Sequence, residues 1–385
     1  MQMVVSQKQL SQLIARLDGQ PVVALDTEFM REKTYWPHLC LLQVAIEDES
    51  WLVDPLSYGL DLRPFGDVLG NPQVLKLFHA SGQDLQILEH ETGVAPCPIF
   101  DTQDAAALLG YPEQIGYGPL VRGVLGVRLG KADGFTDWAR RPLSADQLRY
   151  AEEDVTWLFR MYPEIIAELG RLGREHWLDE DFARKADPAH YVVDPREQYL
   201  RLKRVGQLRP RQLAIARELA EWREETAQQR NLPRRWLMSD EAVLEIARRA
   251  PATREALLDL RGVTLKGRHY ADQVLAAVRR GVDLPDDRLP ETPGRAQDER
   301  EITVSVELMT ALARTRASEN RLSPTVLASR ALLEELVLAS REARDSCTLM
   351  TGWRRAMIGE ELARLLDGRL ELSLVDGVLQ VRERA

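Results

Sequence analysis

The sequence has few cysteines, no long hydrophobic run and no phosphate-binding glycine loop. Cys40, Cys97 and Cys347 are far apart and odd in number, which fits neither a disulfide framework nor a zinc ribbon. No apolar run approaches about 18 residues, so no transmembrane helix is expected. The N-terminal segment lacks the basic stretch and apolar core of a signal peptide, which predicts a cytoplasmic protein. A helicase is disfavoured because GKAD at 130–133 lacks the earlier glycine and the Ser/Thr of a phosphate-binding loop.

The composition is that of a globular protein with an uneven distribution of charge. The 385 residues are 44% hydrophobic and 29% charged, and a chain of this length is expected to form two or three domains. The net charge of −9 divides into −13 for residues 1–195, +8 for 196–280 and −4 for 281–385. This asymmetry would suit an acidic, cation-binding domain joined to a basic, anion-binding one, although solvated helix surfaces also collect arginines.

Strand and helix signals alternate through the first part of the chain and then give way to helices alone. Apolar β-branched runs predict strands at 21–29, 39–46, 51–54 and 74–80, followed by a helix and then by a further short strand and helix at 98–110. This pattern indicates an α/β domain built around one sheet. Beyond Asp194 the sequence is helical, apart from a proline-rich and charged segment at 284–299 that reads as a linker.

Three short motifs carry acidic residues in positions suited to metal binding. Asp26 and Glu28 lie two residues apart on the first strong strand and therefore on one face of it. Asp84 falls in the first turn of the helix after the strand at 74–80, where a helix-dipole role would also explain it. Tyr150 and Asp154 are one helical turn apart, after a capping box made by Ser144 and Gln147. Each motif is weak alone.

In this order and context the motifs resemble those of the DEDD superfamily of 3′→5′ exonucleases, in its tyrosine-bearing branch. The three motifs are LDTEF, HASGQDLQIL and YAEEDV, and the match is closest to the ribonuclease D family over about residues 1–185. The histidine-bearing branch would have His at the position of Arg149, so that branch is disfavoured.

The resemblance implies a fold, a site and a reaction. The fold would be an α/β ribonuclease-H-like exonuclease domain, a mixed sheet flanked by helices, followed by two small all-α HRDC-type domains. Asp26, Glu28, Asp84 and Asp154 would bind two divalent ions, Mg²⁺ or Mn²⁺, because hard oxygen ligands select hard cations. Tyr150 would position the attacking water. The terminal phosphodiester of an RNA would be hydrolysed to release nucleoside 5′-monophosphates, with tRNA precursors and other small structured RNAs as the family's substrate class.

Other residues in family-like stretches are candidates for contacts with the terminal nucleotides, although packing or solvation would also explain them: Tyr35, His79, Gln83 and Lys131. The domain boundaries that we expect are 1–195 for the exonuclease domain, 196–283 for a basic, nucleic-acid-binding HRDC domain, 284–299 for the linker and 300–385 for a second HRDC-like domain. No membrane and no obligate protein partner is implied.

Two alternatives stay open from the sequence. A 3′→5′ DNA exonuclease of the same branch would use the same site, and HRDC domains also occur in RecQ helicases. A non-catalytic RNA-binding protein with a decayed nuclease domain is disfavoured, because all five predicted site residues are present.

Overall fold

The computed structural model describes residues 1–130, 136–191, 193–263, 268–291 and 299–384, and it divides into two compact units. The first unit comprises Met1–Glu28, Leu39–His190 and Asp298–Ala385, and the second comprises Phe29–His38 and Tyr191–Gln297. Each unit is described separately. None of the described helices is both long and apolar enough to cross a membrane.

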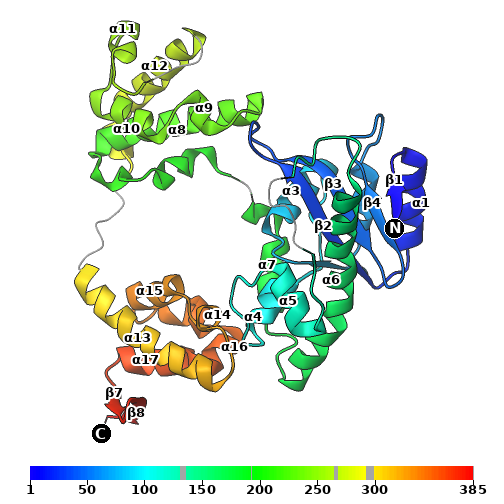
Figure 1. Cartoon of the computed structure of the whole chain (residues 1–385). Coiled ribbons are helices and arrows are strands. Elements are labelled where there is room, and N and C mark those ends of the chain that lie inside the picture. The colour runs from blue at the N-terminus through cyan, green and yellow to red at the C-terminus, as the bar shows by residue number, and fades with distance from the viewer. Residues whose placement is uncertain (131–135, 192, 264–267, 292–298, 385) are drawn as a thin grey trace. The chain divides into compact units, whose positions relative to one another are not determined.

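The first unit is built on a six-stranded mixed sheet with the strand order β1-β4-β3-β2-β5-β6. Strands β1, β2, β3 and β4 of this sheet are labelled in Figure 1. The strands are β1 (Gln2–Val4), β2 (Val22–Met30), β3 (His38–Ala45), β4 (Ser50–Val53), β5 (Leu75–Phe78) and β6 (Ile99–Asp101). β2, β5 and β6 run parallel to one another, whereas β3 and β4 are antiparallel. The predicted α/β domain is thus confirmed, and the carboxyl ends of β2, β5 and β6 meet at one edge of the sheet.

Helices cover this sheet. They are α1 (Gln7–Leu17), α2 (Gly66–Leu69), α3 (Gly82–Thr92), α4 (Thr102–Ala107), α5 (Tyr117–Leu125), α6 (Ala145–Arg171) and α7 (Asp179–Ala186). The long helix α6 begins at the predicted capping box of Ser144 and Gln147 and packs on β4 and β5. Its buried stripe of Ala151, Val155 and Leu158 faces the core, which fixes the rotation of the helix about its axis.

The C-terminal part of the first unit is helical, as expected, but ends in a hairpin. Its helices are α13 (Glu299–Glu319), α14 (Pro324–Leu327), α15 (Arg330–Leu338), α16 (Gly352–Arg354), a π-helical turn (Arg355–Gly359) and α17 (Glu360–Leu366). Antiparallel strands β7 (Leu370–Val375) and β8 (Val378–Glu383) then follow. The all-α expectation missed them. Asp376 and Gly377 both have positive φ, 51° and 78°, as the central residues of a tight hairpin turn require.

The second unit is helical and has its own apolar core. It contains a 3-10 segment η3 (Pro195–Arg201) and the helices α8 (Pro210–Arg230), α9 (Arg234–Leu237), α10 (Asp240–Arg249), α11 (Arg254–Leu258) and α12 (Arg268–Val282). α8 and α12 approach closely because Gly281 has no side chain, and a Cβ there would lie 2.6 Å from the Cα of Ile215. Ser239 is the N-cap of α10, and its side chain accepts a hydrogen bond from the backbone N–H of Ala242.

The segment between β2 and β3 also belongs to the second unit. The hydroxyl of Tyr35 hydrogen-bonds to the buried carboxylate of Glu224 on α8. Arg234 places its guanidinium 5.5 Å from the centre of the Tyr35 ring and its Nε 2.6 Å from Glu224. The backbone N–H of Trp36 donates to the side chain of Asn231 over 3.0 Å. The sequence around α8 does not indicate that Tyr35 is a partner of Glu224.

Candidate active site

The strand β2 carries the first two acids of the site. Asp26 and Glu28 lie on the same face of the strand, as their spacing predicts, and both are partly buried. One carboxylate oxygen from each of Asp26, Glu28 and Asp154 lies within 4.8 Å of the others. Three carboxylates from two distant parts of the sequence therefore converge on a volume the size of a cation site.

The fourth acid comes from the turn after the neighbouring strand. β5 runs parallel to β2, so the helix that follows it begins at the same edge of the sheet. Asp84 lies in the first turn of this helix, α3, and is only 7% exposed. The hydroxyl of Thr27, between the two acids of β2, donates a hydrogen bond to Asp84 Oδ1. Asp84 thus borders the group of three, and its charge also acts on Asp26 and Glu28.

The helix α6 supplies the remaining acid and a phenol. Asp154 is 8% exposed and is hydrogen-bonded by the side chain of Tyr150, one turn earlier. The Tyr150 ring has its centre 6.1 Å from that of the buried Trp138. The helix geometry and the aromatic neighbour together hold the Tyr150 hydroxyl beside the carboxylates.

The four carboxylates are crowded and short of positive charge. Burial is the main cause that raises the pKa of each, to about 8 for Glu28 and about 7 for Asp84 and for Asp154. The pKa of Asp26 lies well above its usual value because of burial and then of repulsion from Asp84, Asp154 and Glu28. Among the residues that the structure describes, no lysine or arginine is a leading cause of these pKa shifts. Buried acids without a cationic partner are costly, and divalent ions would neutralise them.

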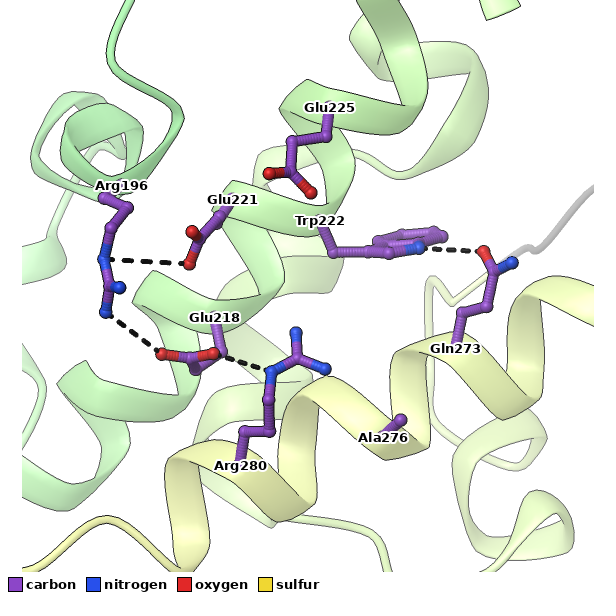
Figure 2. Close-up of a pocket in the computed structure, with 8 residues that line it drawn as sticks. All are labelled: Arg196, Glu218, Glu221, Trp222, Glu225, Gln273, Ala276 and Arg280. Carbon is purple, nitrogen blue, oxygen red and sulfur yellow. Dashed lines mark hydrogen bonds and ion pairs between the residues drawn. The ribbon is translucent and has the colours of Figure 1, made fainter. Parts of the chain in front are cut away.

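The pocket of about 520 Å³ in the second unit has a different character (Figure 2). Its three acids, Glu218, Glu221 and Glu225, all belong to α8, and Glu218 is paired with Arg280 at 2.8 Å and with Arg196 at 3.7 Å. Trp222 donates its indole N–H to Gln273 over 2.9 Å. None of the predicted site residues lines this pocket. Glu218 and Glu221 already have arginine partners, so the uncompensated acids at the sheet edge are the better candidates for metal chemistry.

The four candidates for nucleotide contacts have different positions. Tyr35 lies in the second unit, against Glu224, and Lys131 lies outside the described residues. The ring nitrogens of His79 contact Thr102 Oγ1 at 3.0 Å and the Ile115 carbonyl oxygen at 3.1 Å. Gln83 is exposed, next to Asp84 in the sequence. Of the three described candidates, Gln83 is the exposed one and precedes Asp84 in the sequence, whereas His79 already has partners on both ring nitrogens.

The structure also adds residues to the site that the motif search missed. Thr27 bonds to Asp84, and the hydroxyl of Tyr117 donates to the carbonyl oxygens of Glu153 and, more closely, Asp154. The pKa of Tyr117 is raised by burial and then by Asp154 and Asp26, which places this phenol within the field of the acid cluster. Thr27 lies inside the motif LDTEF and could have been considered, but nothing in the sequence near Tyr117 indicates its position.

Comparisons with known proteins identify relatives of this chain. Residues 1–169 match the family model described as 3′-5′ exonuclease, and residues 212–278 match the HRDC domain. The chain is 40% identical to ribonuclease D of Nitrobacter hamburgensis over 388 residues, covering 100% of both, and 39% identical to ribonuclease D of Sphingobium indicum, covering 98% of both. The crystal structure of Escherichia coli RNase D, described as an exoribonuclease involved in structured RNA processing, superposes with a TM-score of 0.85 at 30% identity, covering 95% of this chain and 98% of that one.

Proposed function

The chain belongs to the ribonuclease D family of 3′→5′ exoribonucleases, and from that premise we propose that Asp26, Glu28, Asp84 and Asp154 bind two divalent metal ions at its active site. The observation that carries the proposal is the convergence of three of these carboxylates within 4.8 Å, with the fourth hydrogen-bonded to Thr27 beside them. Exonucleases of this superfamily generally use divalent metal ions. Mg²⁺ and Mn²⁺ suit a site made only of carboxylate oxygens.

The bound ions would activate water, orient the scissile phosphate and stabilise the leaving oxygen. The chain's own contribution is to hold the carboxylates in place before metal arrives. Strand β2 fixes the spacing of Asp26 and Glu28, and helix α6 fixes Asp154 one turn from Tyr150. Burial keeps competing water away from these ligands and strengthens their attraction for a cation.

Tyr150 is proposed to orient the attacking water through a hydrogen bond. Its pKa is raised by burial and then by the negative charges of Asp154, Glu28 and Asp26, so the phenol stays protonated at neutral pH. A protonated phenol is a poor general base. Its hydroxyl, anchored by Asp154, is instead suited to fixing the direction from which water approaches the terminal phosphate.

The substrates that we propose are the 3′ ends of tRNA precursors and other small structured RNAs, shortened with release of nucleoside 5′-monophosphates. The last nucleotides have to be unstacked for their phosphate to reach a buried cluster, which favours single-stranded 3′ tails. The basic segment 196–283 would bind the RNA body through its phosphates, as a charge of +8 over 196–280 suggests.

We also propose domain boundaries at 1–195, 196–283, 284–299 and 300–385. We propose that the last segment is an HRDC-like domain. The predicted cytoplasmic location stays a prediction.

The test is a time course on matched 3′-tailed tRNA-precursor, unstructured RNA and DNA substrates with Mg²⁺, Mn²⁺ or EDTA. Stepwise shortening of RNA from the 3′ end, dependent on metal and lost in Asp154→Asn, is expected. Arg149→Gln, on the same helix but exposed, is the matched control and should retain activity. Faster degradation of DNA than RNA would contradict the substrate, and full activity in Asp154→Asn would contradict the site.

Tyr150→Phe is expected to lower kcat about a hundredfold with little change in KM, because the hydroxyl acts on the attacking water and not on substrate binding. Single-turnover measurements at saturating RNA and metal would check it. Tyr162→Phe, three turns further along α6 and outside the acid cluster, is the control. An unchanged kcat for Tyr150→Phe would remove Tyr150 from the reaction.

A further inference from the structure

Besides the four proposed metal ligands, the first unit holds another buried carboxylate, and hydrogen bonds and a lysine neutralise its charge. Asp101, the last residue of β6, is 0% exposed. Its Oδ1 accepts the backbone N–H groups of Ala80 at 2.9 Å and Gln103 at 3.0 Å. Its Oδ2 accepts the backbone N–H and the hydroxyl of Ser81, both at 2.8 Å, and the ammonium of Lys185 at 2.6 Å.

The groups that Asp101 holds form the turn that leads into the metal site. Ala80 has a φ of 60°, a left-handed conformation that is unfavourable for a residue with a side chain. Ser81 is the N-cap of α3, but its hydroxyl bonds to Asp101 and not to the helix. Asp84 follows three residues later, in the first turn. The position of Asp84 therefore depends on a strained turn that is held by one carboxylate.

The charge of that carboxylate depends in turn on a lysine from α7. Burial alone would raise the pKa of Asp101, but Lys185 and the hydrogen bonds from Ser81 lower it. Lys185 also lies 2.8 Å from Asp104. Helix α7 is fixed against β6 by Phe182, whose ring centre is 5.3 Å from that of Phe100, the neighbour of Asp101. The packing of α7 on β6 thus holds the ammonium of Lys185 against the carboxylate of Asp101.

We propose that Lys185 is a positioning residue for the metal ligand Asp84 and acts through Asp101 and the Ala80–Ser81 turn. The inference rests on the proposed metal-binding role of Asp84. Lys185 itself would touch neither metal nor RNA. Without the charge of Lys185, Asp101 would be a buried anion lacking a cationic partner. The hydrogen bonds from the Ala80–Ser81 turn to Asp101 would then weaken. Residues that orient metal ligands from behind typically change metal affinity 10- to 100-fold when replaced.

The experiment measures Mn²⁺ binding directly, by titration calorimetry or by the electron paramagnetic resonance of free Mn²⁺, on the full chain without RNA. Lys185→Met is expected to bind Mn²⁺ about 10- to 100-fold more weakly than the wild type. Lys185→Arg, which keeps the charge, should recover most of the affinity. Arg184→Met, the neighbouring residue on α7 whose partner is Asp181, is the matched control and should bind Mn²⁺ as the wild type does.

Activity supplies a second signature. At low metal concentration Lys185→Met should have a lowered kcat on a short RNA, an unchanged KM and recovery with excess Mn²⁺. If Lys185→Met does not fold, the same measurements are made on Lys185→Gln, because glutamine keeps hydrogen-bond donors but has no charge. Wild-type Mn²⁺ affinity in either variant would overturn the inference. If the proposed metal site itself were wrong, the result would be different, because Asp26→Asn would then bind Mn²⁺ as tightly as the wild type.

Discussion

Asp26→Asn is expected to abolish RNA hydrolysis and, at the same time, to stabilise the metal-free protein. The loss should exceed about a thousandfold, because the proposed ions stabilise charge in the transition state by several kcal/mol. The gain in stability should be about 1–2 kcal/mol, or roughly 2–8 °C in Tm at pH 8 in EDTA. The causes are the burial of the Asp26 charge and then its repulsion from three neighbouring acids, which together raise the pKa of Asp26. Thermal unfolding and single-turnover hydrolysis would measure the two effects.

The matched control for stability is another buried aspartate in the same unit. Asp101→Asn also removes one buried charge, but Asp101 is paired with Lys185 and its pKa is lowered. Breaking a compensated pair should destabilise the protein by about 3 kcal/mol. The two substitutions are therefore expected to shift Tm in opposite directions. A lower Tm for Asp26→Asn in EDTA would show that the acid cluster is not the repulsive site described above.

Metal binding is expected to tighten steeply with pH. In the metal-free protein the pKa of Glu28 is about 8 and those of Asp84 and Asp154 are about 7, so these groups hold protons at pH 6. Metal binds the carboxylate form and must release those protons. Mg²⁺ affinity should rise at least about a hundredfold between pH 6 and 8.5, and calorimetry in buffers of different ionisation enthalpy should detect more than one proton released at pH 6. An affinity independent of pH would contradict this.

The same pKa values set the sign of the effect on stability. Carboxylates in the unfolded chain titrate near pH 4, whereas those of the folded cluster titrate near 7 to 8. Between these limits the folded state holds more protons than the unfolded state, so the cluster's contribution to the free energy of unfolding falls as pH rises. Saturating Mg²⁺ should remove that loss, since the ions replace the protons.

Much of the fold could be predicted because its signals are local. The strand at 21–29 is an apolar β-branched run, and the start of α6 is marked by Ser144 and Gln147 within four residues of each other. The hairpin at the C-terminus also had a local signal in Asp376 and Gly377, which the emphasis on helical periodicity overlooked. By contrast, the place of residues 29–38 in the second unit depends on Tyr35 and Glu224, which are 189 residues apart.

Some residues of the candidate site could likewise be predicted from local motifs, and others could not. Asp26, Glu28 and Asp154 could be identified because their motifs occur in family order, and the structure brings their carboxylates together. Neither Asp101 nor Lys185 belongs to any of these motifs. Their roles depend on the packing of α7 against β6, which no local pattern encodes.

The most direct test of the central claim is to locate Mn²⁺ by anomalous scattering in crystals of the protein soaked with the ion. Two Mn²⁺ ions about 4 Å apart, with Asp26, Glu28, Asp84 and Asp154 as their protein ligands, are predicted. A single ion that leaves Asp84 uncoordinated, or ions bound elsewhere while these four carboxylates stay metal-free, would contradict the two-metal account of this exoribonuclease.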